Sequence, residues 1–230
     1  MSKISGILFD FNGTLLPDSK LHMECFRRVF PLFGAPKPDD EYIVKNIFGR
    51  STENIYLENI NPNPTKDEID AYVNVKNGLY YDMCLSLGEN FRLCNGAYEM
   101  LDYLKDNDIP YCLATGSNRE EVEFYMEHLD LGRWFSYDNI VYTDGTFACK
   151  PAPDCYILAA KRLGLSTSEC VVFEDGKAGI IAANAAGAGA VVAVYESDLP
   201  SPVSDELSVY ASRNDFSDWH SLLSELGIIS

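Results

Sequence analysis

The stretch ISGILFDFNGT, residues 4–14, joins a short apolar run to an acid and a glycine-containing loop. Residues 4–9 are mostly apolar and bounded, which is typical of a short strand buried on both faces of a sheet. Asp10 follows directly, and Asn12-Gly13 comes two residues later. In open parallel sheets, ligands bind beyond the carboxyl ends of the strands. The stretch therefore predicts a first strand that ends in a functional carboxylate.

Three more apolar runs resemble buried strands, and helical patterns separate them. The runs are residues 109–114, 170–173 and 190–194. The helical patterns cover residues 96–105, 120–129, 154–163 and 178–186, and residues 215–226 form a closing amphipathic helix. Strands that alternate with helices of this length indicate βαβ units. We therefore expect an α/β fold with a Rossmann-like core built on a parallel sheet.

The segment between the first two strands shows no strand pattern. Helical patterns cover residues 22–33, 40–48 and 51–59. Thr65, with Glu68 three residues on, predicts the capped start of another helix that runs to about Leu87. We therefore expect an inserted all-helical domain at residues 18–90, and a core domain made of residues 1–17 and 91–230.

Composition narrows the possible partners and the compartment. Of 230 residues, 18 are Lys or Arg and 35 are Asp or Glu, which gives a net charge of −17. Such a surface repels nucleic-acid phosphates and anionic membranes, so neither is expected as a partner, and no protein partner is predicted. The seven cysteines contain no CxxC pair, which favours reduced, buried thiols. Without a signal peptide or an apolar run of about 18 residues, a cytoplasmic protein is expected.

Reactive side chains follow the predicted strands and one loop. Asp10 follows the first run, Thr115-Gly116-Ser117 the second, and Glu174-Asp175 the third, while Lys150 lies in a proline-rich loop. This set suits phosphoryl transfer, because a carboxylate such as Asp10 can attack phosphorus and Mg²⁺ prefers oxygen ligands. Lys150 and the backbone amides next to the glycines can offset negative charge on the phosphoryl oxygens. Thr115 and Ser117 could also cap the helix that begins near Arg119.

Four segments resemble the motifs of the haloacid dehalogenase superfamily. They are residues 9–15, Thr115, residues 150–153 and residues 173–175, and residues 179–187 are similar to the phosphatase and β-phosphoglucomutase-like branch. The resemblance implies a C1-type helical cap over the core. Leu21-His22 lies where that branch enters its cap, and Gly49-Arg50-Ser51 where it has a cap substrate loop.

The resemblance also implies roles for single residues. Asp10 corresponds to the nucleophile and a Mg²⁺ ligand, the carbonyl group of Asn12 and the Asp175 carboxylate to further ligands, and Glu174 to a residue acting through metal-bound water. Thr115 and Lys150 correspond to the catalytic residues of motifs two and three. The expected substrate-binding residues are Gly13, Thr14, Gly116, Ser117 and Asn118 in the core, with His22 and Arg50 in the helical insert.

Asn12 departs from the family pattern, which has an aspartate as general acid and base at that position. General acid–base catalysis is worth about 10²–10⁴ in rate, and an amide cannot exchange a proton. His22 or a cap carboxylate could take over the proton transfer, or the substrates could have good leaving groups. Alternatively, the phospho-aspartate hydrolyses slowly, or Asn12-Gly13 deamidates to restore an acid.

The expected function is Mg²⁺-dependent hydrolysis of a small, sugar-phosphate-like metabolite through an aspartyl-phosphate on Asp10. A β-phosphoglucomutase-like mutase, a phosphonate or C–halogen hydrolase, and a catalytically weak phosphate-binding module stay open as alternatives.

Overall fold

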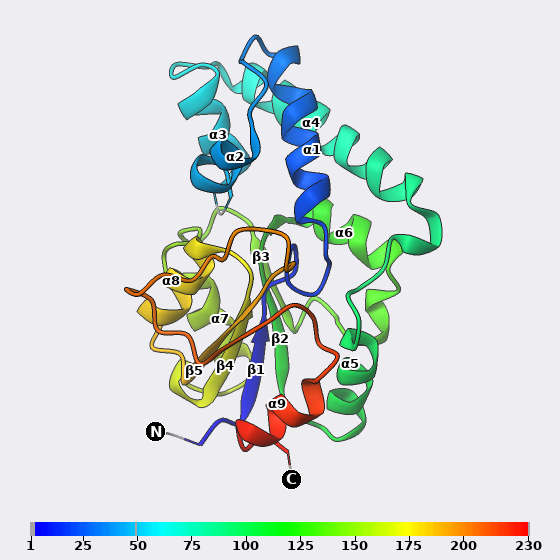
Figure 1. The fold of residues 1–230 in the computed structure, drawn as a ribbon, viewed down its shortest axis with the longest axis vertical. Coiled ribbons are helices and arrows are strands. Elements are labelled where there is room, and N and C mark those ends of the chain that lie inside the picture. Colours follow the sequence, from blue (N-terminus) through cyan, green and yellow to red (C-terminus); the bar gives the residue numbers. More distant parts are fainter. Residues whose placement is uncertain (1–2, 49, 230) are drawn as a thin grey trace. The chain divides into compact units, whose positions relative to one another are not determined.

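A computed structural model describes residues 3–48 and 50–229, so Gly49 of the predicted cap loop lies outside the described residues. The chain divides into two compact units (Figure 1). Met1–Pro17 and Leu93–Ser230 form an α/β unit, and Asp18–Arg92 form a helical unit.

The α/β unit contains a parallel sheet with the strand order β3-β2-β1-β4-β5-β6 among the described residues. The strands are β1 (Gly6–Phe9), β2 (Tyr111–Asn118), β3 (Ile140–Thr143), β4 (Cys170–Glu174), β5 (Ala190–Val194) and β6 (Ala211–Arg213). The helices of this unit are α5 (Ala97–Asp106), α6 (Arg119–His128), α7 (Asp154–Arg162), α8 (Lys177–Ala185) and α9 (Trp219–Glu225), with short 3-10 turns at Leu131–Arg133 and Thr167–Glu169.

The core of this unit covers both faces of the sheet. On one face, side chains of α7 and α8 pack on alternate strand residues such as Leu8 and Val172. The next residue along each strand points the other way, and there Phe9, Phe173 and Phe216 form an aromatic cluster. The central strands β1 and β4 are buried throughout, as their continuous apolar sequences predict.

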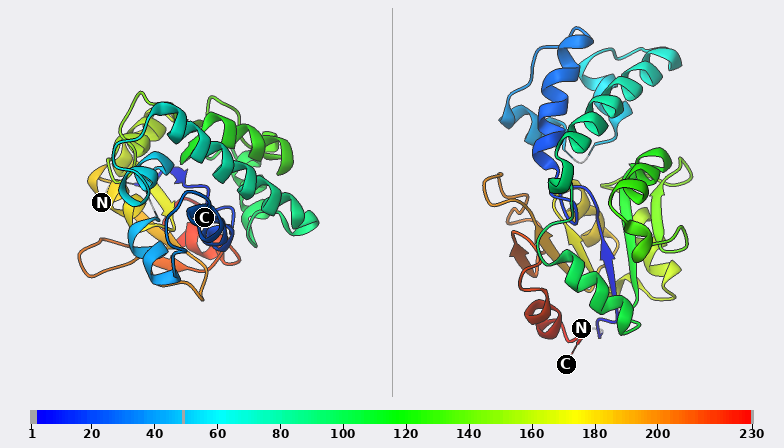
Figure 2. Two further views of the ribbon diagram at one scale, coloured as in Figure 1. Left: turned by 90° about the horizontal axis from the view of Figure 1, so that it is seen from above. Right: turned by 90° about the vertical axis from the view of Figure 1, so that its right-hand side faces the viewer.

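The helical unit contains α1 (Ser19–Leu32), α2 (Asp40–Asn46), α3 (Thr52–Asn59) and α4 (Lys66–Ser86), followed by a 3-10 turn at Gly88–Asn90. Figure 2 shows α1 beside α4 within this unit, and the two helices pack against each other. The capping box predicted at Thr65 and Glu68 is present and starts α4. Phe33, Tyr56 and Tyr72 form an aromatic cluster inside the unit.

The predicted fold class is confirmed, because a parallel sheet with flanking helices is combined with an all-helical segment, α1–α4. Two strands, β3 and β6, were not predicted from the sequence, and they lie at the two edges of the sheet. They have four and three residues, respectively, and β6 contains no apolar run, so pairing with a neighbouring strand defines them. The seven cysteines are free, and six are buried. No helix among the described residues has the length and hydropathy needed to cross a membrane.

Candidate active site

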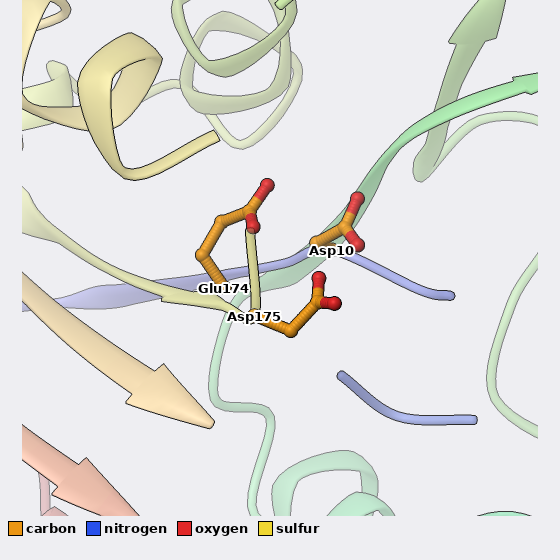
Figure 3. Close-up of side chains that lie close together, drawn as sticks. All are labelled: Asp10, Glu174 and Asp175. Carbon is orange, nitrogen blue, oxygen red and sulfur yellow. The ribbon is translucent and has the colours of Figure 1, made fainter. Parts of the chain in front are cut away.

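Three carboxylates meet where β1 and β4 end. The two strands pair in parallel with Phe9 opposite Phe173, and the Asp10 amide donates to the carbonyl oxygen of Phe173 at 2.9 Å. This register places Asp10 next to Glu174 and Asp175, and one carboxylate oxygen of each lies within 4.8 Å of the others (Figure 3). The sequence prediction that these strand ends converge is therefore correct in geometry.

Lys150 joins two of the three acids. Its Nζ donates to Asp10 Oδ1 at 2.5 Å and to Glu174 Oε1 at 2.6 Å, and all three side chains are at most 11% exposed. Burial raises the pKa of the Asp10 carboxyl to about 7, against the lowering effect of the Lys150 ammonium. Burial also opposes the charge on Lys150, but Asp10 and Glu174 outweigh it and hold the lysine pKa well above its ordinary value.

This donor set fits a hard divalent cation. It offers carboxylate oxygens alone, and a single ammonium does not balance three acids, of which Asp10 and Glu174 are buried. Mg²⁺ prefers such oxygen ligands, and its charge would favour the ionised form of Asp10, whose pKa is raised mainly by burial. Asp10, Glu174 and Asp175 could therefore hold a metal ion.

Glu174 is fixed on both of its oxygens. Besides Lys150, the Tyr156 hydroxyl on α7 donates to Oε1 at 2.9 Å, and the Gly176 amide donates to Oε2 at 2.8 Å. Gly179 lies directly against the carboxylate, because a Cβ atom there would come within 1.5 Å of Oε1. Tyr156 was not predicted from the sequence, since a tyrosine on the apolar face of a helix has the pattern of an ordinary core residue.

A neutral hydrogen-bonded group surrounds Asn12. Its Nδ2 donates to the Tyr125 hydroxyl of α6 at 2.8 Å, and its Oδ1 accepts from Ser117 Oγ at 2.9 Å. Thr115 Oγ1 in turn accepts from the Ser117 amide at 3.0 Å. Asn12, Thr115 and Ser117 were expected near one another, whereas Tyr125 was missed. Its ring packs 4.7 Å from that of Phe11, so its apolar setting hid it.

Asn118 caps α6, and the alternative that Thr115 or Ser117 does so is wrong. Asn118 Oδ1 accepts from the Glu121 amide, and Glu121 Oε2 accepts from the Asn118 amide, both at 3.0 Å. Ser117 Oγ points instead to Asn12. The reason is geometric, because β2 continues through Asn118 and the helix begins at the next residue.

The remaining predicted core residues line the same strand ends. Gly13 has a φ of 77°, a left-handed conformation that favours glycine. Thr14 is buried, and its Oγ1 lies 3.5 Å from Asp175 Oδ1. The carbonyl oxygen of Gly116 accepts from Thr143 Oγ1 at 3.1 Å.

His22 and Arg50 belong to the helical unit and are described within it. The His22 ring stacks on Tyr80 at 4.4 Å, and its Nε2 lies 3.2 Å from Asp18 Oδ2. Arg50 forms an ion pair with Glu58 of α3, and both side chains are more than 40% exposed. Their predicted roles in substrate binding stay predictions.

Comparison with known proteins identifies the family. Residues 4–187 match the family of hydrolases described as haloacid dehalogenase-like hydrolases. The chain belongs to the haloacid dehalogenase-like hydrolases. This confirms the resemblance drawn from the sequence motifs and makes the protein an enzyme of the hydrolase class.

Individual relatives of this haloacid dehalogenase-like hydrolase are similar to it over most of their length. The phosphorylated carbohydrates phosphatase of Thermotoga maritima is 29% identical over 84% of this chain and 87% of its own. The fructose-1-phosphate phosphatase YqaB of Escherichia coli is 32% identical over 82% of this chain and 96% of its own. The crystal structure of a HAD hydrolase of family IA, variant 3, from Entamoeba histolytica has a TM-score of 0.82 at 31% identity, covering 97% of this chain and all of that one.

Proposed function

We propose that this enzyme is a Mg²⁺-dependent phosphohydrolase of a small, sugar-phosphate-like metabolite and acts through an aspartyl-phosphate on Asp10. The observation that carries the proposal is the acidic cluster at the ends of β1 and β4, in which Lys150 is hydrogen-bonded to the two buried members. The names of the two relatives from Thermotoga maritima and Escherichia coli, both phosphatases of phosphorylated carbohydrates, support this substrate class.

Asp10 is the proposed nucleophile. Its carboxylate oxygen forms a bond to phosphorus as the bond between phosphorus and the substrate oxygen breaks, and the alcohol leaves with a proton. Water then attacks phosphorus, the bond to Asp10 breaks, and inorganic phosphate is released. Lys150 keeps its proton because of the acids around it, so its ammonium offsets negative charge on Asp10 and on the phosphoryl oxygens.

The metal site proposed for this reaction uses Asp10, Asp175 and the backbone carbonyl group of Asn12, with Glu174 beside them. When bound, Mg²⁺ supplies the positive charge that allows a phosphate anion to approach these carboxylates. Glu174 already accepts hydrogen bonds on both oxygens, so we assign it to holding Lys150 and the metal site in place.

Asn12 replaces the family's general acid and base in this proposal. Its amide makes hydrogen bonds through both Nδ2 and Oδ1, and it has no proton to exchange at neutral pH. The proton for the leaving group therefore comes from water or from the substrate itself. We accordingly expect turnover to depend steeply on the leaving group, with phosphates of acidic alcohols or phenols preferred over alkyl phosphates.

The phosphoryl oxygens are assigned to the neutral side of the site. Thr115 offers a hydroxyl group there, and Gly116 offers a backbone amide. The amides of Gly13 and Asn118 already donate to the Leu16 carbonyl oxygen and to Glu121, and the Ser117 hydroxyl donates to Asn12. We further propose that the helical unit serves as the substrate cap. Thr14 of the α/β unit and His22 and Arg50 of the helical unit are among the residues that we assign to selecting the substrate. The domain limits at residues 17/18 and 90/91 are part of this proposal.

An aryl phosphate assay with and without Mg²⁺ tests the proposal. We expect Mg²⁺-dependent release of phosphate by the wild type and none by Asp10→Asn. Asp130→Asn is the matched control, because it makes the same change at an exposed acid of the α/β unit and should retain full activity. Equal activity of wild type and Asp10→Asn would refute the assignment of the nucleophile.

A further inference from the structure

We infer that Tyr156 is a positioning residue of the acidic cluster, which holds Glu174 and Lys150 in the arrangement that binds the metal ion and stabilises the transferred phosphoryl group. This inference rests on the proposed function for its kinetic consequences. Its effect on metal binding can be measured without turnover.

Tyr156 contacts two members of the cluster from one side. It lies in the first turn of α7 and is fully buried. Its hydroxyl is 2.9 Å from Glu174 Oε1, and its ring centroid is 4.9 Å from Lys150 Nζ. The hydroxyl therefore fixes the acid, while the ring face lies against the ammonium that this acid shares with Asp10.

The hydroxyl group of Tyr156 is not needed to fill the core. Phenylalanine would fill the same volume without burying a polar group, and a buried hydroxyl is costly unless it is hydrogen-bonded. The Tyr156 hydroxyl is satisfied in this way, because it donates a hydrogen bond to the Glu174 carboxylate.

The surroundings of Glu174 show that its position is specified from several directions. Lys150 and Tyr156 both donate to Oε1, and the Gly176 amide donates to Oε2. Gly179 leaves room for the carboxylate, where any side chain would collide with it. Tyr156 is the only uncharged side chain in this set, so it can be changed without altering the charge of the site.

Removing the hydroxyl would take one hydrogen bond from Glu174 Oε1 and would shift the position of the Lys150 ammonium. With one donor lost, Glu174 Oε1 would depend on Lys150 alone and draw the ammonium away from Asp10. Loss of such an outer partner typically reduces metal affinity or activity by about 10–100-fold. We therefore expect Tyr156→Phe to weaken Mg²⁺ binding and to lower kcat, each by about tenfold, with KM little changed.

Tyr111 provides a matched control. Its buried hydroxyl also makes a 2.9 Å hydrogen bond, but to the backbone carbonyl oxygen of Trp134, at the start of β2 and away from the strand ends. Tyr156→Phe and Tyr111→Phe thus each remove one hydroxyl group from a buried hydrogen bond of the same length. Both should lower the Tm to a similar extent, and Tyr111→Phe should leave Mg²⁺ binding and kcat unchanged.

The test measures Mg²⁺ affinity by calorimetry, Tm by thermal unfolding, and kcat and KM on an aryl phosphate. A second arm repeats Tyr156→Phe in a Glu174→Gln background, where the inference predicts little further change in Mg²⁺ affinity because the partner charge is already lost. A Tyr156→Phe protein that binds Mg²⁺ and turns over like Tyr111→Phe would overturn the inference, as would full additivity with Glu174→Gln. If neither the wild type nor any variant shows turnover that depends on Asp10, the proposed function fails, and the calorimetric comparison still decides the role of Tyr156.

Discussion

The two sides of the candidate site are built from different chemistry. On the side of β4, buried charges are held by other charges, with Lys150 placed between Asp10 and Glu174. On the side of β2, neutral groups are held by hydrogen bonds, with Asn12 placed between Tyr125 and Ser117. The difference is that one side carries acids that could hold a metal ion, while on the other side the position expected to move a proton carries an amide that cannot do so.

A substitution that gives the neutral side an ionisable group should have the largest effect on kcat. In Asn12→Asp, a carboxyl group takes the place of the amide, and the Tyr125 and Ser117 hydroxyls can both donate to it. We expect kcat for alkyl phosphates to rise by about 10²–10⁴, and by less for aryl phosphates, whose leaving groups need no proton. Steady-state kinetics on the two substrate classes checks this.

The double variant Asp10→Asn, Asn12→Asp is the control and should be inactive. An Asn12→Asp protein that is no faster than the wild type on alkyl phosphates would show that another group already moves the proton.

Displacement of the Glu174 carboxylate should have the next largest effect on activity. This change affects the charged side alone. A Cβ atom at position 179 would lie 1.5 Å from Glu174 Oε1, whereas one at position 176 would make an ordinary contact of 3.6 Å with Oε2. We expect Gly179→Ala to lower kcat/KM and Mg²⁺ affinity by about 10–100-fold, and Gly176→Ala to change them little. Similar results for the two alanine variants would mean that the position of Glu174 does not matter to activity.

The charged side should also make the stability of the metal-free protein depend on pH. The Asp10 pKa is raised from 3.8 to about 7 by burial, so the folded state binds a proton that the unfolded state releases. This contribution is complete below about pH 4 and is lost as the pH rises through about 7. The free energy of unfolding should therefore fall between about pH 5 and pH 7, by at most about 1.4 kcal/mol per pH unit.

Urea unfolding in EDTA measures this dependence, and Asp10→Asn is the comparison because it removes the titrating group. The slope should be shallower in Asp10→Asn. Parallel slopes in the two proteins would place the titration elsewhere.

The neutral side should be the less sensitive to small changes. Ser117→Ala removes one hydrogen bond to Asn12 and leaves the bond to Tyr125, so we expect kcat/KM to fall by about tenfold or less. Ser86→Ala is the control, because its hydroxyl donates to the Met83 carbonyl oxygen within the helical unit. A loss on Ser117→Ala as large as that caused by Gly179→Ala would contradict the division between the two sides.

The sequence predicted the parts of the molecule that depend on local patterns. The buried strands β1 and β4 are continuous apolar runs, and the acids after them could be placed together because parallel strand ends share one edge of a sheet. The capping box of Thr65 and Glu68 could be predicted as well, since its two residues are only three positions apart in the sequence.

What the sequence could not predict depends on tertiary contacts. Tyr125 and Tyr156 have the apolar surroundings of core residues, and only the packing of α6 and α7 brings their hydroxyls to Asn12 and Glu174. The edge strand β6 is too short for an alternating pattern and is defined by its pairing with β5. A hydroxyl group at the end of an otherwise apolar side chain leaves no signal in the hydrophobic pattern.

The most direct test of the central claim is to detect the phosphoryl group on Asp10 itself. The enzyme is mixed with an aryl phosphate and Mg²⁺, quenched in acid within milliseconds to seconds, and digested for mass spectrometry of the peptide that contains residues 4–14. We predict that this peptide gains the mass of one phosphoryl group, that the group lies on Asp10, and that the gain is absent from Asp10→Asn. Turnover without any phosphorylated Asp10, or phosphorylation of another residue that persists in Asp10→Asn, would contradict the proposal that Asp10 is the nucleophile.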